Sequence, residues 1–344
     1  MRTSLRQLLT TGSVLLADGA TGTNYFDMGL GPGDPPELWN VEHPERVTAL
    51  HQAFVDAGAD IILTNTFGAN RSRLALHGNE HRVRELAERA AALARAVADA
   101  SPRPVVVAGS VGPTGELFEP LGALTSAVAD EVFHEQCAGL RDGGADVVWI
   151  ETMSAPEEVR SAARGAIAAG LPYAATCSFD TAGRTMMGVL PDELAAMFDG
   201  LAVPPLAFGA NCGVGASDIL FTVLAMSAAA TGAAATGEVG ERPVLICKGN
   251  CGIPRFEGAE AMYTGTPELM ADYARLAADA GARIIGGCCG TTPVHLAAMR
   301  QALDTRVPRA RPTLEEVIAA IGPLVNTPPT ALPTEGRERR RRRA

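Results

Sequence analysis

Eight short apolar runs, spaced along most of the chain, constrain its fold more than any other feature of the sequence. They cover residues 14–18, 59–67, 105–112, 145–152, 172–179, 206–212, 243–250 and 282–289. The runs are mostly continuous rather than alternating, which is typical of strands buried on both faces, as in a parallel sheet. We therefore expect eight parallel β-strands.

Amphipathic stretches between these runs predict helices at 43–58, 83–100, 129–144, 155–170 and 267–281. All but the second end in glycine, a common residue just past a helix C-terminus. Eight strand–helix units in roughly 300 residues fit an α/β fold of the (β/α)₈ TIM-barrel type. An open doubly wound sheet is the alternative, but DGATGT (18–23) after the first run lacks the G-x-G-x-x-G spacing of a dinucleotide fold.

The predicted organisation is a single barrel domain, residues 1–322, followed by a disordered tail at 323–344. The tail is rich in Pro and Thr and then in Arg, a composition typical of a solvated extension. Contact of this tail with RNA or an acidic surface is the alternative. The segment 225–242 predicts a lengthened sixth helix followed by a flexible loop.

Composition excludes several classes of protein. The formal net charge of −10 argues against nucleic acid as a main partner. No apolar stretch is long and uniform enough to cross a bilayer, and the N-terminus lacks the pattern of a signal peptide. Seven scattered cysteines do not form a secreted disulfide framework. We expect a cytoplasmic protein that binds no membrane. The sequence leaves open whether the protein forms a homo-oligomer.

Polar and special residues recur where the predicted strands end. They are Asp18, Asn65, Ser110, Glu151, Asn211, Cys212, Lys248, Asn250, Cys288 and Cys289. In barrel enzymes the carboxyl ends of the strands carry the active site. The repeated position therefore predicts one site at the barrel mouth.

Three of the cysteines predict a metal site. Cys212, Cys288 and Cys289 lie in glycine-rich surroundings at the ends of the sixth and eighth strands. Soft thiolates favour Zn²⁺, although Co²⁺ or Fe²⁺ could substitute, and catalytic zinc keeps one position open. A vicinal disulfide at 288–289 is the alternative. Cys251 is left out of the predicted ligand set, because a fourth thiolate would close the site.

Two carboxylates and one lysine are further candidates. A buried carboxylate at a strand end needs a partner, and a substrate amino group would serve for Asp18 and Glu151; hydrogen bonds to loop amides are the alternative. Lys248 is the only lysine beside 28 arginines. Its presence reflects either a need for a compact ammonium group at this position or chance.

The motifs that carry these residues resemble the homocysteine S-methyltransferase family. They are DGATGT (18–23), NTFGAN (65–70), ETMSAP (151–156), GANCG (209–213) and GGCCGTTPVH (286–295), and the resemblance covers about residues 10–305. It implies a barrel, Zn²⁺ on Cys212, Cys288 and Cys289, and homocysteine activated as a thiolate. It also implies that Asp18 and Glu151 recognise the amino acid. We add Asn211 to the expected substrate-binding residues.

The methyl donor is open among three classes that the resemblance implies: a corrinoid-bound methyl group, S-methylmethionine and glycine betaine. The chain lacks cobalamin and folate modules, and PELWN, SFDTAGRTMMG and KGNCGIP look most like bacterial betaine–homocysteine methyltransferases. Trp39 is similar to a Trp of the animal betaine enzymes and would face a quaternary ammonium. Gly68 stands where those enzymes have Tyr, so a cage would need other rings, such as Tyr25 or Phe26.

The expected function is therefore zinc-dependent methyl transfer to the thiol of L-homocysteine, forming L-methionine, with glycine betaine as favoured donor and dimethylglycine as its product. One alternative is a stand-alone homocysteine-activating subunit that accepts the methyl group from a separate corrinoid protein. The other is an enzyme that uses S-methylmethionine or another sulfonium. The expected partners are otherwise the small-molecule substrates alone.

Overall fold

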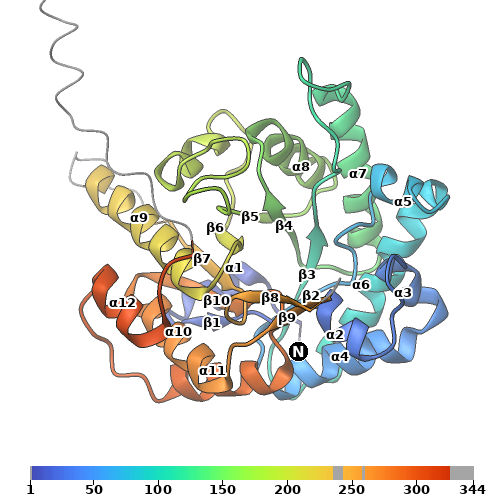
Figure 1. The fold of residues 1–344 in the computed structure, drawn as a ribbon. Coiled ribbons are helices and arrows are strands. Elements are labelled where there is room, and N and C mark those ends of the chain that lie inside the picture. The colour runs from blue at the N-terminus through green and yellow to red at the C-terminus, as the bar shows by residue number, and fades with distance from the viewer. Residues whose placement is uncertain (1, 235–242, 258–259, 326–344) are drawn as a thin grey trace, which may run out of the picture.

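A computed structural model describes residues 2–234, 243–257 and 260–325. Eight parallel strands form a barrel in the order β1-β10-β7-β6-β5-β4-β3-β2, and a parallel bridge from Ala17 to Ile61 closes the ring (Figure 1). The barrel strands are β1 (Leu15–Leu16), β2 (Ile61–Leu63), β3 (Val106–Val111), β4 (Val147–Met153), β5 (Tyr173–Cys177), β6 (Ala207–Cys212), β7 (Leu245–Gly249) and β10 (Ala282–Gly287). The predicted (β/α)₈ barrel is confirmed, with one strand in each of the eight apolar runs; only β4 extends beyond its run, by one residue.

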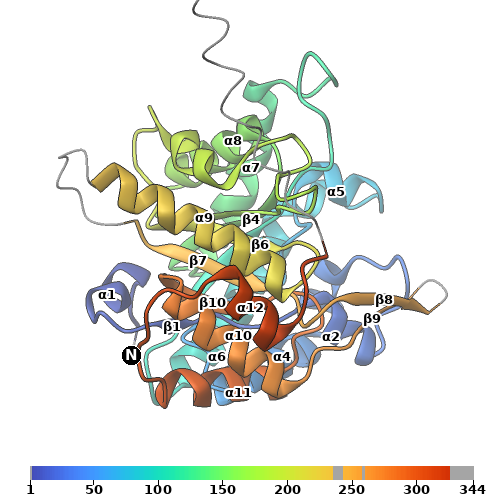
Figure 2. The same ribbon diagram turned by 60° about the vertical axis from the view of Figure 1, so that its left-hand side comes forward.

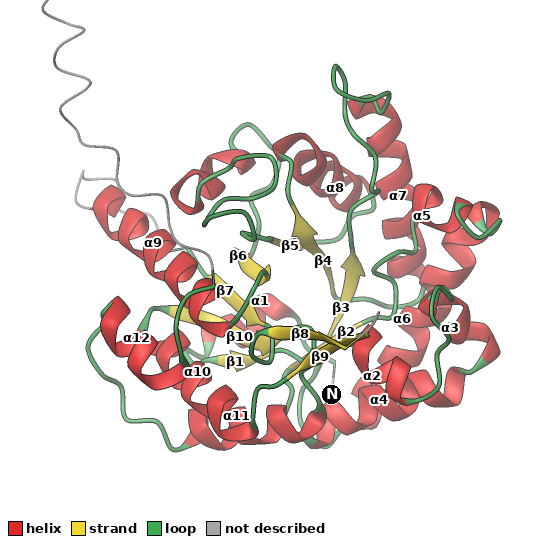
Figure 3. Cartoon of the chain, in the orientation of Figure 1, coloured by secondary structure: helices red, strands yellow, loops and turns green. Residues whose placement is uncertain are grey.

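Helices surround the barrel (Figure 3). The longer ones are α4 (Pro44–Asp56), α6 (Val83–Ala100), α7 (Ser126–Asp142), α8 (Pro156–Ala168), α9 (Ala216–Ala234), α10 (Pro267–Asp279) and α11 (Pro293–Asp304). Shorter helices are α1 (Leu5–Thr10), α2 (Gly22–Asp27), α3 (Trp39–Glu42), α5 (Arg71–Ala75) and α12 (Leu314–Ile321), with 3₁₀ turns η1 (Pro36–Leu38), η2 (Glu80–Arg82) and η3 (Pro191–Phe198).

Two helices begin directly after a threonine that caps their first turn, and one of them starts earlier than predicted. The helix predicted from residue 129 begins at Ser126, because the Thr125 side chain accepts a hydrogen bond from the Val128 amide and caps the first turn. Thr266 caps α10 in the same way, with Pro267 in the first helical position.

An antiparallel hairpin between β7 and α10 was not expected. Its strands are β8 (Pro254–Glu257) and β9 (Glu260–Tyr263), and Figure 2 shows it reaching away from the barrel. The lengthened sixth helix is present as α9, whereas the loop predicted after it, 235–242, lies outside the described residues. Most of the predicted tail, 326–344, also lies outside them.

The barrel interior is filled by apolar side chains from alternate positions of the strands. They include Leu15, Ile61, Val106, Trp149, Ala174, Ile246 and Ile284, with Leu5 of α1 in the same cluster. A larger apolar layer lies between strands and helices. None of the helices in the described part of the chain is long and apolar enough to cross a membrane.

Candidate metal centre and substrate cavity

The three cysteines singled out from the sequence come together at the barrel mouth. Cys212 ends β6, and Cys288 and Cys289 follow β10. Their sulfur atoms all lie within 4.8 Å of one another, and the Cys212 and Cys289 sulfurs are 3.9 Å apart. In the described residues this is the one group of cysteine, histidine and acidic side chains placed to hold a metal ion.

Asn250 holds the two cysteine loops in register. Strand β7 lies between β6 and β10, so the residue after it can reach both sides. The Asn250 side chain donates to the Gly213 carbonyl at 2.8 Å and accepts from the Cys289 amide at 3.1 Å. Cys212 itself adopts a left-handed backbone with φ of 61°, a strained conformation that the surrounding contacts must maintain.

The donor set fits a thiophilic divalent cation. Two sulfur ligands on a tetrahedral zinc, each at about 2.3 Å, would stand roughly 3.8 Å apart. The measured 3.9 Å between the Cys212 and Cys289 sulfurs matches that spacing. All seven cysteines are free, so neither the vicinal pair nor any other forms a disulfide. The Cys251 sulfur contacts the Gly265 carbonyl at 3.4 Å instead of joining the cluster.

The three thiols share their protons unequally. Hydrogen bonds from Cys212 and Cys288 hold the pKa of the Cys289 thiol below its usual value. Hydrogen bonds to Cys288 and Cys289 raise the pKa of Cys212. A bound cation would stabilise all three as thiolates, since metal ligation deprotonates cysteine.

Glu151 is a buried carboxylate close to this cluster. It lies in β4 with 8% of its surface exposed, and its Oε1 accepts a hydrogen bond from the Ser110 hydroxyl at 2.5 Å. Burial raises the pKa of Glu151 to about 7, although Lys248 works to lower it. A cationic group entering the cavity would supply the ion pair that the carboxylate lacks in the described part of the chain.

Asp18 and Lys248 form a buried ion pair at the top of the barrel core. The Lys248 ammonium is 2.9 Å from Asp18 Oδ1, and Asp18 Oδ2 accepts from the Leu63 amide at 2.6 Å. Each side chain is 2% exposed. Burial works to lower the pKa of Lys248, but the Asp18 and Glu151 carboxylates outweigh it, so the pKa is raised and the lysine is charged. The only lysine of the chain therefore has a specific buried partner.

Asn211 links the cysteine cluster to the Glu151 strand. Its Oδ1 accepts from the Thr152 amide at 2.8 Å and from the Thr176 hydroxyl at 2.6 Å. Its Nδ2 donates to the Thr152 hydroxyl at 2.7 Å. Because Thr152 has a left-handed backbone, with φ of 61°, these bonds hold the end of β4 in an otherwise unfavourable conformation.

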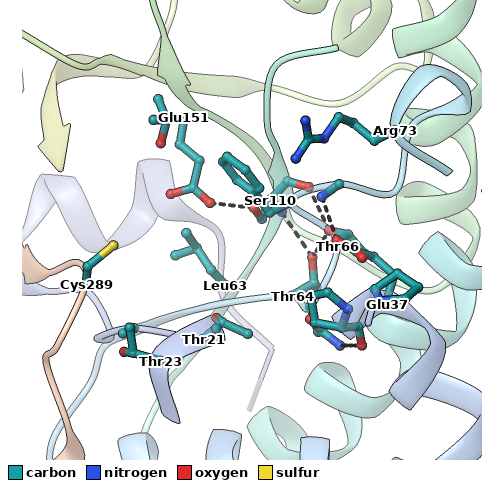
Figure 4. Close-up of a pocket in the computed structure, with 18 of the residues that line it drawn as sticks. Thr21, Thr23, Glu37, Leu63, Thr64, Thr66, Arg73, Ser110, Glu151 and Cys289 are labelled. Carbon is teal, nitrogen blue, oxygen red and sulfur yellow. Dashed lines mark hydrogen bonds between the residues drawn. The ribbon is translucent and has the colours of Figure 1, made fainter. Parts of the chain in front are cut away.

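A cavity of about 660 Å³ opens over the strand ends, a size typical of small-molecule sites. Its lining includes Glu151, Lys248 and all three clustered cysteines. Figure 4 shows Cys289 and Glu151 on one side and Glu37 and Arg73 on the other. Neither Asp18, which is paired with Lys248, nor Asn211, which precedes Cys212 in β6, is part of the lining.

The structure does not bring Trp39 into this cavity lining. Trp39 is 6% exposed; its ring packs against Tyr25, with centroids 5.1 Å apart, and the Arg46 guanidinium lies over it. Tyr25 is fully buried as well. The cavity instead has two other aromatic rings, Phe26 and Phe67.

Sequence reasoning missed several residues of the cavity. Glu37 and Arg73 line its outer end. Tyr263, at the end of β9, lies outside the lining but close to the cysteine cluster, where it works to lower the pKa of Cys289. A charged residue within the otherwise apolar PPELW was a usable signal for Glu37. The segments that carry Arg73, in α5, and Tyr263, in β9, gave none.

Comparisons with known proteins agree with this site. A model of the homocysteine S-methyltransferase family matches residues 15–303. Solved structures of the Escherichia coli homocysteine methyltransferase MmuM are similar: the metallated form is 25% identical, with a TM-score of 0.70, covering 86% of this chain and 99% of that one. The oxidised form is 26% identical, with a TM-score of 0.69 and coverage of 86% and 98%.

Two curated relatives are named methionine synthase. That of Mycobacterium leprae is 31% identical over 319 residues, 86% of this chain and 25% of that protein. That of Mycobacterium tuberculosis is 32% identical over 302 residues, 82% of this chain and 24% of that protein. The chain thus spans about a quarter of the length of these relatives. Fold, cysteine cluster and family match agree, and the chain belongs to the homocysteine S-methyltransferase family.

Proposed function

We propose that this chain is a zinc-dependent enzyme that transfers a methyl group to the thiol of L-homocysteine and so forms L-methionine. The observation that carries the proposal is the convergence of three cysteine sulfurs beside a buried carboxylate that has no cationic side chain within ion-pair distance in the described residues. Both line one cavity. A thiol amino acid offers a sulfur for the first and an ammonium group for the second.

Cys212, Cys288 and Cys289 would hold the Zn²⁺ ion. When bound, the ion lowers the pKa of a substrate thiol that reaches it, which supplies a nucleophilic thiolate near neutral pH. Asn250 keeps the Cys289 loop against Gly213, so the ligands are oriented by neighbouring contacts.

Glu151 would bind the ammonium group of homocysteine. Asp18 would act through Lys248, because both Asp18 oxygens are already engaged inside the barrel. The Lys248 ammonium lines the cavity and would attract the substrate carboxylate. Asn211 would orient the end of β4 through Thr152.

The methyl donor would be an onium compound, with glycine betaine favoured. In the transfer, the thiolate sulfur forms a bond to the methyl carbon while the carbon–nitrogen bond breaks. Its electron pair returns to nitrogen, so betaine leaves as dimethylglycine. Such a displacement depends on in-line positioning and exclusion of water. The rings of Phe26 and Phe67 are suited to the onium charge.

The test is methionine formation by the purified zinc-loaded protein. Homocysteine is supplied with glycine betaine, S-methylmethionine or dimethylsulfoniopropionate as sole donor. Turnover with betaine is expected. Turnover with a sulfonium donor only would show that betaine is not the donor and would leave the proposed activation of the homocysteine thiol in place. No methionine from any onium donor would overturn the proposal of an onium-dependent enzyme.

The methionine synthase relatives favour one second candidate, because the chain matches only about a quarter of their length. In that case the chain is a homocysteine-activating subunit that accepts the methyl group from a separate corrinoid protein. Methionine formation that requires a methylated corrinoid would identify it. Under either candidate, seven free cysteines fit a reducing compartment such as the cytoplasm.

A further inference from the structure

The end of the cavity away from the thiols carries two opposite charges that the proposed chemistry does not use. Glu37 and Arg73 both line this outer end (Figure 4). Asp34 and His77 are the other titratable groups there; both are exposed, as Arg73 is, whereas Glu37 is buried. Among the described residues, neither Glu37 nor Arg73 has an ion-pair partner within 4.0 Å.

Glu37 is a buried carboxylate that faces the cavity. It is 4% exposed, and its Oε1 accepts a hydrogen bond from the Gly68 amide at 2.6 Å. The Asn65 side chain donates to the Pro36 carbonyl at 2.6 Å and fixes the 3₁₀ turn that presents Glu37. A Cβ atom at Gly68 would stand 2.9 Å from Glu37 Oε1, so the missing side chain at position 68 makes room for this carboxylate. Burial raises the pKa of Glu37 more than the nearby Arg73 and His77 lower it, so a cationic ligand would stabilise the buried carboxylate.

Arg73 has an uncommitted guanidinium. It lies on α5, whose start is fixed by Asn70, which accepts from the Arg73 amide at 3.0 Å. In the part of the chain that the structure describes, the Arg73 side chain makes no hydrogen bond or ion pair, although it lines the cavity. A guanidinium in this setting is a ready partner for a carboxylate.

Aromatic surface lies at the same end. The Phe67 ring packs where a side chain at position 112 would stand, since a Cβ on Gly112 would be 2.6 Å from two of its ring atoms. Phe67 is 38% exposed and lines the cavity, as does Phe26. The outer end thus combines the Glu37 carboxyl group, the Arg73 guanidinium and the apolar ring of Phe67.

We propose that Glu37 and Arg73 determine the specificity for the methyl donor, selecting zwitterions that carry both an onium centre and a carboxylate. Glu37 faces the onium centre and Arg73 binds the carboxylate. This inference rests on the proposed function and narrows its donor from any onium compound to onium acids. A donor with one charge would leave either Glu37 or Arg73 without a partner.

Three non-covalent probes separate these contributions. Glycine betaine carries both charges, 3,3-dimethylbutanoate has the same shape with the carboxylate alone, and tetramethylammonium has the onium charge alone. Their dissociation constants are measured by calorimetry on the zinc-loaded protein without homocysteine. A hydrogen-bonded charge contact corresponds to roughly a tenfold change or more in affinity. The native protein should therefore bind betaine about tenfold more tightly than either single-charge probe.

Two variants assign each charge. Arg73→Gln should weaken betaine and 3,3-dimethylbutanoate about tenfold and leave tetramethylammonium unchanged. Glu37→Gln should weaken betaine and tetramethylammonium and leave 3,3-dimethylbutanoate unweakened; the amide oxygen can still accept from Gly68. Gly68→Ala should mimic Glu37→Gln, because it displaces the carboxylate without removing it. Arg89→Gln, an exposed arginine of α6 outside the cavity lining, is the matched charge control and should change nothing.

Equal betaine affinity in Arg73→Gln and the native protein would overturn the inference. So would an equal loss for all three probes, which indicates a general structural effect. The proposed function is tested separately by methionine formation. The native protein could bind the probes in the expected order and still make no methionine. That result would refute the onium-dependent reaction but support the binding of onium acids by Glu37 and Arg73.

Discussion

Replacing Glu151 with glutamine should make the protein more stable and, at the same time, worse at binding homocysteine. Glutamine keeps an oxygen that can accept from the Ser110 hydroxyl, and it removes only the charge. Because the native carboxylate is buried without a cationic partner at ion-pair distance in the described residues, the charge is unfavourable until the substrate arrives. Stability and binding therefore change in opposite directions.

The magnitude follows from the raised pKa of Glu151. Burial raises the pKa from 4.5 to about 7, which corresponds to about 3 kcal/mol at roughly 1.4 kcal/mol per pKa unit. A raised carboxyl pKa means that the folded state holds the proton more tightly than the unfolded state. The stability it contributes is present below about pH 4.5 and is lost as the pH rises through about 7. The advantage of Glu151→Gln should thus reach about 3 kcal/mol at pH 8 and shrink to about 1 kcal/mol at pH 5.

The assay is urea unfolding of the metal-free, reduced protein at pH 8 and pH 5, with the homocysteine KM measured on the zinc-loaded form. Glu157 is an exposed carboxylate on α8, and Glu157→Gln is the matched control. It should change neither the free energy of unfolding nor the homocysteine KM. Loss of the ammonium contact should raise the homocysteine KM about tenfold. A Glu151→Gln protein that is less stable than the native one at pH 8, or that binds homocysteine equally well, would refute the reasoning.

Three further predictions concern the same site. The native KM for homocysteine should rise as the pH falls below about 7, because protonation removes the Glu151 charge; a flat profile from pH 8 to pH 6 would contradict this. Cys289→Ala should lose both bound zinc and activity, measured by elemental analysis and turnover, whereas Cys177→Ala in β5 should keep both. Asp18→Asn should lower the free energy of unfolding by about 3–5 kcal/mol, because it leaves Lys248 buried and unpaired. A loss below about 1 kcal/mol would mean that water or another group solvates the lysine.

The barrel and the cysteine cluster were predictable because both depend on repeated local patterns. Continuous apolar runs are typical of buried strands, and eight of them alternating with helices favoured a closed parallel barrel over an open sheet. Closure brings the strand ends together, so Cys212 and Cys288, which are 76 positions apart in the chain, had to converge. Glu151 followed from the same rule.

The outer cavity was not predictable in this way. Glu37 and Arg73 lie in long connections after β1 and β2, where hydrophobic periodicity says nothing about direction. Resemblance to the animal betaine enzymes pointed to Trp39. In the structure Glu37 of the turn η1 lines the cavity, whereas Trp39 packs on Tyr25. The β8–β9 hairpin was missed for a related reason, because strands of four residues carry too little pattern to be recognised.

The central claim is that three cysteines hold a zinc ion that homocysteine then reaches through its sulfur. X-ray absorption at the zinc edge, on the loaded protein before and after addition of L-homocysteine, tests it most directly and needs no methyl donor. We expect the number of sulfur neighbours of zinc to rise from three to four, with no such rise in Glu151→Gln at the same subsaturating homocysteine concentration. An unchanged sulfur count on saturation of the native protein with homocysteine would contradict it.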